Sequence, residues 1–152
     1  MYRKATEGDC RTVYDFVCSL ESRELPYDSF SQIFRAQTAD KGYYCLLREE
    51  GGKPIGMLNL RFEYQLHHAA RIAEILEFTV LADFRNQGIG KEMLQTAFEI
   101  AKQNGCVQIE VASNQLRTDA HRFYQREGMK NFHYKLSKSL TGDDSEENRI
   151  GR

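Results

Sequence analysis

The sequence predicts an α/β fold: a mixed, mostly antiparallel central sheet with helices on both faces. Two observations lead to this class. Three β-rich segments follow one another between residues 43 and 81, with helical periodicity on either side of them. After them, a long amphipathic helix lies between two strand-like segments, which is the pattern of a strand–helix–strand crossover. The predicted order is therefore strand, two helices, three strands, helix, strand, helix, strand.

The first elements are a short strand and two helices. Residues 2–5 alternate weakly between polar and apolar side chains, and Thr6 and Asp9 then offer helix caps. The apolar side chains that follow recur at helical spacing: Val13, Phe16, Val17 and Leu20. A second helix is predicted over 27–38 on the same kind of pattern. Together these two helices are expected to cover one face of the sheet.

The central strands come next. Residues 43–48 read as a strand and 55–65 as its hairpin partner, joined by a turn in which Gly51 and Gly52 permit positive φ angles. Residues 71–81 form a third strand, rich in residues that favour β-structure. Such a run of consecutive strands predicts the antiparallel part of the sheet.

The C-terminal part alternates helices and strands. A long helix with the apolar face Leu94, Ala97, Phe98 and Ala101 ends at Gly105. A strand over 107–112, a helix from Thr118 to Gly128 and a last strand over 129–138 follow. We therefore expect one domain over residues 1–140 and a polar, disordered tail over 141–152.

Composition excludes several function classes. The 152 residues are 41% apolar and 28% charged, an ordinary balance for a globular protein. No run approaches the ~18 apolar residues of a membrane span, and no secretory leader is visible, so we expect a cytoplasmic protein without a membrane partner. The net charge of −1 gives no reason to expect nucleic acid. The spacing of Cys10, Cys18, Cys45 and Cys106 fits no zinc template, and no metal is expected.

The chemistry-bearing segment is the loop between the third strand and the long helix. Gly88 and Gly90 remove side chains where the backbone enters the helix, so the N–H groups of the first helical turn can face an anion. Arg85 adds a positive charge beside them. The segment is neither a Walker A loop nor a dinucleotide fingerprint, because no Gly-Lys-Ser/Thr ends it and Met93 stands where a third glycine is needed. A short pyrophosphate cradle remains, although glycines here can also serve close packing alone.

This loop, its flanking elements and the element order resemble the GNAT family of N-acetyltransferases over residues 1–138. A second motif supports the resemblance: Asn114 followed by Ala120-x-x-Phe123-Tyr124-x-x-x-Gly128. The resemblance implies the GNAT fold and acetyl-CoA as cosubstrate. It also implies that the pyrophosphate is bound by the loop residues, namely Arg85, Asn86, Gln87, Gly88, Ile89, Gly90 and Lys91.

Further segments look like one branch of that family, the aminoalkylphosphonate N-acetyltransferases. These are the run from Arg117 to Gly128, Leu66-His67-His68, and Glu74-Ile75-x-Glu77. The loop of that branch is less rich in glycine than the present one, which is a departure from the pattern. Arg71 and Arg117 are candidates to meet an anionic acceptor such as a phosphonate.

Acetyl transfer to an amine needs a base for the ammonium, a donor for the oxyanion and a proton for the departing thiolate. Two carboxylates, Glu74 and Glu77, lie on the strand before the loop. Regular alternation places them on opposite faces, a rule that a bulge would break. The resemblance favours Glu74 as the base, directly or through a water, but each glutamate also fits an ordinary salt bridge. The choice between them stays open.

The other roles follow from the resemblance. Tyr124 is the candidate acid, because a phenol with a pKa near ~10 can protonate a thiolate; core packing is its alternative role. Asn114 is implied to contact the pantetheine arm. Backbone groups of Phe78, Thr79 and Val80 are implied to bind the pantetheine and the oxyanion, in a gap where relatives separate two strands.

The sequence thus predicts an N-acetyltransferase that moves an acetyl group from acetyl-CoA to the primary amine of a small molecule by direct transfer in a ternary complex. An aminoalkylphosphonate is the first candidate, and amino sugars, polyamines, amino acids and protein N-termini are the others. A non-catalytic acyl-CoA-binding module and a nucleotide site at the glycine loop remain as alternatives. Family members are commonly dimers, so a homodimer is expected. His67 and His68 should face opposite ways in an extended segment, and His121 is placed to orient Tyr124.

Overall fold

A five-stranded sheet runs through the first part of the computed structural model, which describes residues 1–142. Its strands lie in sequence order: β1 (Tyr2–Lys4), β2 (Tyr43–Glu50), β3 (Lys53–Gln65), β4 (Ala70–Val80) and β5 (Cys106–Val111). Neighbours from β1 to β4 are antiparallel, whereas β4 and β5 are parallel. The predicted mixed, mostly antiparallel sheet is confirmed.

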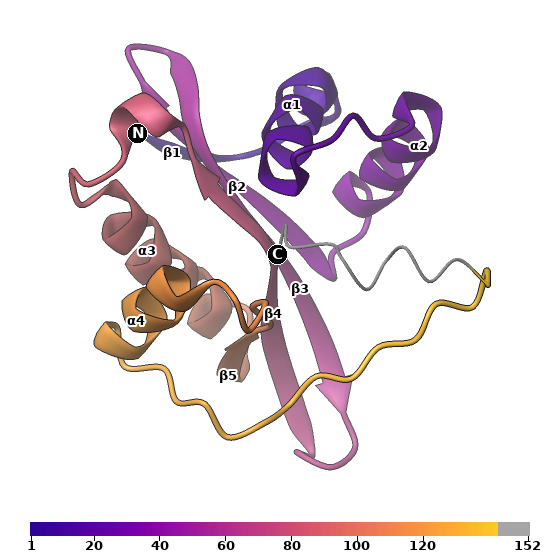
Figure 1. The fold of residues 1–152 in the computed structure, drawn as a ribbon, viewed down its shortest axis with the longest axis vertical. Helices are drawn as coiled ribbons and strands as arrows, with labels where there is room; N and C mark the ends of the chain where they lie inside the picture. The colour runs from indigo at the N-terminus through magenta and orange to yellow at the C-terminus, as the bar shows by residue number, and fades with distance from the viewer. Residues whose placement is uncertain (143–152) are drawn as a thin grey trace. The chain divides into compact units, whose positions relative to one another are not determined.

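The described chain divides into two compact units, one of residues 1–111 and a second that begins at Ala112. The first unit holds α1 (Cys10–Glu21), α2 (Tyr27–Thr38) and α3 (Ile89–Gln103), and the second holds α4 (Thr118–Arg126). Within the first unit, α1 and α2 cover one face of the sheet and α3 covers the other (Figure 1). The predicted helices on both faces are confirmed, whereas the single domain over residues 1–140 stays a prediction.

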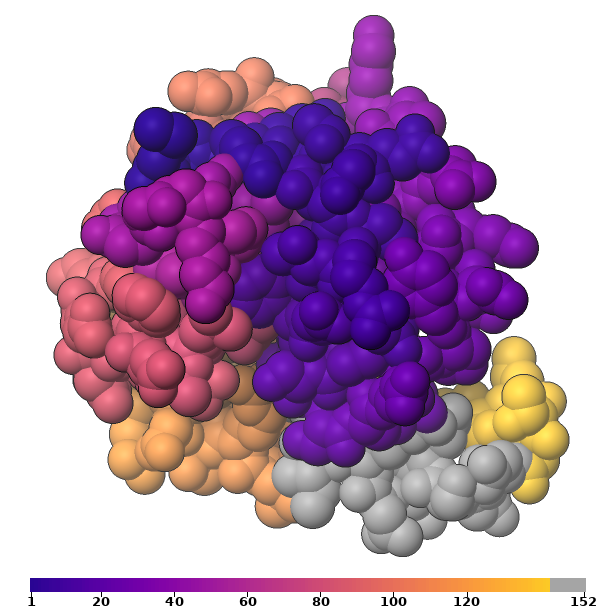
Figure 2. Space-filling model, turned by 90° about the horizontal axis from the view of Figure 1, so that it is seen from above, coloured from indigo at the N-terminus to yellow at the C-terminus, as the bar shows by residue number. Residues whose placement is uncertain are grey.

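The two faces of the sheet have separate cores, which follow from strand alternation. The α1/α2 face is built from buried side chains of both helices and of β2 and β3: Val13, Phe16, Val17, Phe34, Cys45, Leu47 and Met57. On the α3 face, the helix packs directly on β3. A Cβ added to Gly56 would lie 2.7 Å from the sulfur of the fully buried Met93. In the space-filling view, the N-terminal segment with α1 and α2 forms a continuous surface, coloured indigo to purple (Figure 2).

The N-terminal strand is fastened to the first helix by ion pairs. Arg3 holds both carboxylate oxygens of Asp9 at 2.8 Å and also contacts Glu49 on β2. The backbone N–H of Thr6 donates to Asp9 Oδ2 at 2.8 Å, so the same carboxylate caps the helical turn that leads into α1. The Arg3 guanidinium is the main reason that the pKa of Asp9 falls to about 2.

One predicted element is wrong. The last strand expected over 129–138 is not formed, and these residues have no regular secondary structure. Phe132, Tyr134 and Leu136 alternate as a strand would, but they are 76%, 86% and 93% exposed. Alternation predicts a strand only if a neighbour pairs with its backbone, and within residues 1–142 no strand does so. From residue 143 onward, the predicted polar tail lies outside the described residues.

Candidate active site

The pairing between strands β4 and β5 ends before β4 itself does. Their pairing runs from Arg71 opposite Cys106 to Ile75 opposite Val111, while β4 continues to Val80. Residues 76–80 are bordered by β3 on one side, and no strand within residues 1–142 pairs with their other side. Backbone groups on such an edge can bind an extended polar ligand in the manner of an added strand. Phe78, Thr79 and Val80, the predicted pantetheine-binding residues, all belong to this stretch.

The glycine loop leads from this edge into α3. Gly88 is the N-cap of the helix and has a φ of 81°, a left-handed conformation that glycine adopts readily. No side-chain hydrogen bond caps this helix end, and the positive end of the helix dipole lies at the glycine loop, where it favours an anion. Arg85 is exposed and donates through Nε to the carbonyl oxygen of Val80 at 2.8 Å. The predicted anion cradle therefore adjoins the end of β4.

A β-bulge changes the faces on which the two candidate bases lie. Asn59 is opposite Glu77 and Leu60 is opposite Ile75, so Leu76 is an extra residue in β4. Glu74 is opposite Arg61, which lies on the same face of β3 as Asn59. The prediction that Glu74 and Glu77 lie on opposite faces is thus wrong, because the bulge breaks the alternation. Both carboxylates face α1 and α2.

The two carboxylates have different partners. Glu74 Oε2 lies 2.6 Å from Nη2 of Arg61, an ion pair across β3 and β4. Glu77 Oε2 accepts a hydrogen bond from Nδ2 of Asn59 at 3.0 Å, and the same nitrogen donates to Gln37 Oε1 on α2 at 3.2 Å. Glu74 is therefore in an ion pair across the sheet, and Glu77 accepts a hydrogen bond from a buried amide.

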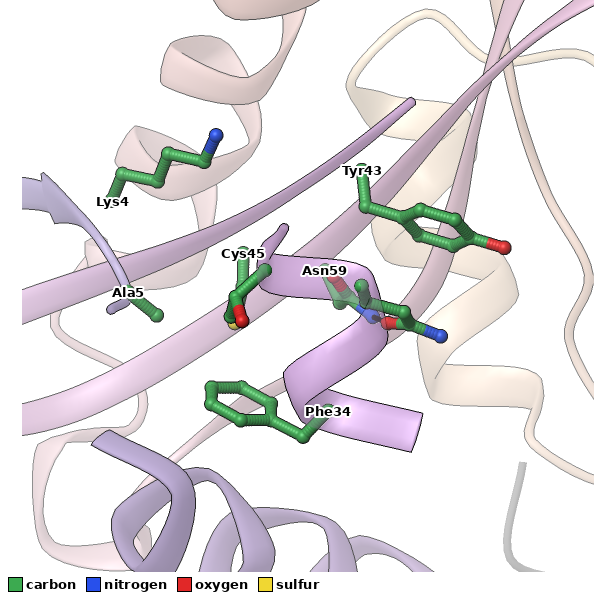
Figure 3. A pocket seen from close by; sticks show the side chains of 8 residues that line it. Lys4, Ala5, Phe34, Tyr43, Cys45 and Asn59 are labelled. Carbon is green, nitrogen blue, oxygen red and sulfur yellow. Dashed lines mark hydrogen bonds between the residues drawn. The ribbon is translucent and has the colours of Figure 1, made fainter. Parts of the chain in front are cut away.

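A small pocket lies beside this amide, between α2 and strands β1 to β3 (Figure 3). Its lining includes Phe34 and Gln37 from α2, and Cys45 and Asn59 from the sheet. Burial is the main cause that raises the pKa of the Cys45 thiol to about 12, with a contribution from the charge of Glu77. The thiol therefore stays protonated at neutral pH and is a poor nucleophile.

In the second unit, Tyr124 is half-buried on α4, and burial raises its pKa above the usual value for a phenol. Asn114 makes a local turn, because its Oδ1 accepts from the backbone N–H of Leu116 at 2.9 Å. The Nε2 of His121 lies 2.8 Å from the carbonyl oxygen of Asn114. His121 thus links α4 to the turn that precedes it. That His121 orients Tyr124 stays a prediction.

Other polar side chains singled out in the sequence have structural partners. Arg71 donates to the carbonyl oxygen of Asn104 at 2.9 Å and stacks on Phe62 and Tyr64, on the α3 face. His67 and His68 occupy the β3–β4 turn with ring centroids 4.3 Å apart. Within residues 1–142, no group of three or more potential ligands is arranged to hold a metal ion. Among the helices of the same residues, none combines the length and apolar character that a membrane span requires.

Sequence reasoning did not single out Asn59, Gln37 or Arg61. A usable signal was present for Asn59, which interrupts the otherwise apolar run from Ile55 to Leu60. A polar residue in the middle of a buried strand needs a hydrogen-bonding partner. The sequence does not reveal that the partners are Gln37 and Glu77, because both contacts depend on register and helix placement.

Comparison with known proteins decides the family. The sequence model of the acetyltransferase (GNAT) family matches residues 11–129. The chain belongs to the GNAT family. An aminoalkylphosphonate N-acetyltransferase of Salmonella typhimurium is 41% identical to this GNAT protein over 138 residues, which is 91% of this chain and 90% of the relative. The protein is accordingly an enzyme of the acyltransferase class.

Solved structures share the fold of this chain. A protein from Bacillus halodurans C-125 described as a transcriptional regulator superposes with a TM-score of 0.83 at 29% identity, covering 92% of this chain and 99% of that one. A possible acetyltransferase from Clostridium difficile 630 has a TM-score of 0.80 at 17% identity, covering 91% and 95%. The second likeness shows the fold alone. The GNAT fold predicted from the sequence is confirmed.

Proposed function

We propose that this GNAT enzyme transfers an acetyl group from acetyl-CoA to the primary amine of an aminoalkylphosphonate, directly within a ternary complex. One observation carries the proposal: a single strand, β4, bears two carboxylates, continues beyond its pairing with β5, and leads straight into the glycine loop. A base and a docking edge for an acyl carrier are thereby adjacent. The phosphonate acceptor is supported by the relative from Salmonella typhimurium, 41% identical over 91% of this chain.

The residues of the first unit fit acetyl-CoA, which supplies an activated thioester when it is bound. The first-turn N–H groups of α3 and the guanidinium of Arg85 suit the pyrophosphate. The part of β4 beyond its pairing with β5, residues 76–80, suits the amides of the pantetheine arm, which can pair with backbone groups as a strand would. A backbone N–H of the same edge, from Phe78 to Val80, would stabilise the oxyanion that forms at the acetyl carbonyl.

Two proton transfers complete the proposed reaction. A carboxylate on the α1/α2 face, Glu74 or Glu77, accepts the proton of the incoming ammonium, so that the neutral amine attacks the thioester. Tyr124 donates a proton to the departing thiolate, and its raised pKa keeps the phenol protonated at neutral pH. Direct attack is favoured over an acetyl-cysteine intermediate at Cys45, because that thiol is buried and protonated.

The test is an acceptor screen. The enzyme is mixed with acetyl-CoA and a panel of primary amines: aminomethylphosphonate, aminoethylphosphonate, amino sugars, polyamines, amino acids and a peptide N-terminus. Release of free CoA thiol is then followed. We expect the fastest release with a phosphonate. Release with another amine alone would refute the phosphonate assignment, and initial rates that fit a ping-pong pattern would refute direct transfer.

The cosubstrate is tested separately by calorimetry. We expect acetyl-CoA to bind, and ATP at the same concentration not to displace it. Displacement by ATP would favour a nucleotide site at the glycine loop. Binding of acetyl-CoA without turnover of any amine in the panel would contradict the proposed acceptor classes.

A further inference from the structure

Arg48 is a charged side chain of the sheet that lies close to the start of α3. It is opposite Gly56 on β3, which is in turn opposite Val80 at the end of β4. Its neighbours Cys45 and Leu47 belong to the α1/α2 core, so alternation along β2 turns Arg48 to the face that α3 covers. The residue therefore stands in the row of the sheet where β4 ends and the glycine loop begins.

Helix α3 approaches the sheet closely at this row. A Cβ added to Gly56 would lie 2.7 Å from the sulfur of Met93, so the missing side chain of this glycine makes room for the helix. The residue before Met93 is Glu92, and its Oε1 lies 3.8 Å from Nε of Arg48. Glu92 belongs to the first turn of α3, four residues after the N-cap Gly88, which is about 6 Å along the helix axis. The close packing thus places an ion pair beside the glycine loop.

Further contacts hold the Arg48 guanidinium in place. Its Nη1 donates to the carbonyl oxygen of Glu49 at 2.6 Å, and its Nη2 lies 3.1 Å from Oε2 of Glu50. The guanidinium also stacks on the ring of Tyr2 on β1, 5.3 Å from the centroid. Only 15% of the Arg48 side chain is exposed. The charge of this arginine is therefore fixed next to the first turn of α3.

Tyr2 lies in the same cluster but supplies no charge. Burial, and to a smaller extent the Glu92 carboxylate, raises the pKa of Tyr2 to about 12. The phenol is therefore neutral at physiological pH. Among the ion pairs of residues 1–142, the one that involves Glu92 is its pair with Arg48. Arg48 is thus the group that compensates the charge of Glu92.

A carboxylate in the first turn of a helix has two opposite effects. It stabilises the helix, because the helix dipole favours negative charge at this end. It also repels an anion bound at the same end, and a repulsion over one helical turn is only partly screened by water and salt. The pyrophosphate of acetyl-CoA, as proposed for the glycine loop, would meet this repulsion. A cation held beside the carboxylate offsets it.

We propose that Arg48 supports acetyl-CoA binding at the glycine loop by compensating the charge of Glu92. Arg48 is a positioning residue, since it acts through Glu92 and not by contact with the cosubstrate. The inference rests on the proposed acetyl-CoA site and adds to it a residue from β2, distant from the loop in sequence. It implies that the charges of Arg48 and Glu92 have opposite effects on affinity.

The test is a double-mutant cycle, with the dissociation constant of acetyl-CoA measured by calorimetry at low salt. We expect Arg48→Met to weaken binding about three- to tenfold, because methionine keeps apolar contact with Tyr2 but leaves Glu92 uncompensated. Glu92→Gln should tighten binding about two- to fivefold, because the repulsion is removed. The double variant should bind about as the wild type does, since both charges are gone.

A merely structural role of the ion pair gives a different pattern. If Arg48 and Glu92 only hold α3 in place, both single variants weaken binding and the double variant binds no better than either. That pattern would overturn the inference. Salt supplies a second readout, because in about 1 M NaCl screening should reduce the effect of Arg48→Met to less than about twofold. A loss of affinity that does not depend on salt would speak equally against charge compensation.

Two control variants address neighbouring charges. Arg35→Met removes an arginine of α2 that pairs with Glu7 at 2.8 Å, and it should leave acetyl-CoA binding within about twofold of the wild type. An effect as large as that of Arg48→Met would refute a local action of Arg48. Glu50→Gln removes the carboxylate partner of Arg48 that lies outside α3. A gain in affinity as large as that of Glu92→Gln would contradict the assignment to Glu92.

Glu92→Gln also guards against misfolding of Arg48→Met, because the Glu92 side chain is 55% exposed and tolerates glutamine. Tighter binding of acetyl-CoA by this variant alone supports the inference, and unchanged or weaker binding refutes it. A wild-type protein that does not bind acetyl-CoA would overturn the proposed function itself. Wild-type binding of acetyl-CoA together with an unchanged affinity in Arg48→Met would overturn this inference alone.

Discussion

Arg85 folds back on the last residue of β4: its Nε donates to the carbonyl oxygen of Val80 at 2.8 Å. The bond joins the start of the glycine loop to the end of β4, which are the two parts of the proposed acetyl-CoA site. It uses one of the five N–H donors of the guanidinium. An exposed arginine anchored in this way loses less side-chain entropy when it binds an anion than a freely rotating one.

We expect Arg85→Ala to weaken acetyl-CoA binding about tenfold or more, because a hydrogen bond to a charged group contributes about 1.5–3 kcal/mol. The affinity of Arg85→Lys for acetyl-CoA should lie between those of the wild type and Arg85→Ala, since lysine keeps the charge without the fork of donors. Calorimetric titration measures both. Lys102→Ala, at the other end of α3, is the control and should bind normally. Equal affinities of Arg85→Ala and Lys102→Ala for acetyl-CoA would show that Arg85 does not contribute to binding.

Gly88 gives a second test of the loop. Its φ of 81° is strained for any residue with a Cβ, by about 1–2 kcal/mol, although a Cβ there would meet no atom within 4 Å. We therefore expect Gly88→Ala to lower the free energy of unfolding in urea by about 1–2 kcal/mol and to weaken acetyl-CoA binding. Gly8→Ala is the matched control, because Gly8 has no left-handed φ and should tolerate alanine. A Gly88→Ala protein as stable as Gly8→Ala would contradict the strain.

Local signals were sufficient for most of the fold. The spacing of apolar residues predicted α2 over 27–38, the range at which the structure has it, and the glycine loop was correctly read as the start of α3. These features depend on neighbours within a few residues. The prediction of a strand over 129–138 was wrong because a strand depends on a distant partner, which its own residues do not specify.

The site was harder to predict than the fold. The run Ile75-Leu76-Glu77 is compatible with a regular strand, and only pairing with Asn59 and Leu60 reveals the bulge. The bulge decides that both glutamates face α2, so alternation alone gave the wrong geometry. The partners of the two glutamates depend on the same register.

Tyr124 is the subject of a third prediction. We expect Tyr124→Phe to lower kcat by about 10²-fold while the KM for acetyl-CoA changes little, since the ring and its packing remain. Because burial raises the pKa of the phenol, the activity lost on its deprotonation should appear only above about pH 10 in the wild type. A pH–rate profile measures this. Tyr134→Phe, at an 86% exposed residue, should behave as wild type. An unchanged kcat in Tyr124→Phe would show that it is not the acid.

The last prediction concerns stability and the ion pair between Arg3 and Asp9. The pKa of Asp9 is about 2 in the folded protein, below its ordinary value of 3.8, chiefly because of the Arg3 guanidinium. A depressed carboxyl pKa stabilises the fold above the unfolded pKa, and this contribution disappears as the pH falls from 3.8 to about 2. We expect Asp9→Asn to lower the free energy of unfolding at pH 7 by about 1–2 kcal/mol, with allowance for solvent screening at Arg3.

Urea denaturation of Asp9→Asn and wild type between pH 7 and pH 2 measures this difference directly. The stability gap should be nearly constant down to about pH 4, shrink below it and be small at about pH 2, where half of the wild-type carboxyl is protonated in the folded protein. Asp15→Asn is the control: its carboxylate is 65% exposed and lies 3.4 Å from Arg11, so its loss should change stability by less than about 0.5 kcal/mol at any pH. A gap for Asp9→Asn that is the same at pH 2 as at pH 7 would mean that the substitution acts through packing or capping geometry and not through the charge.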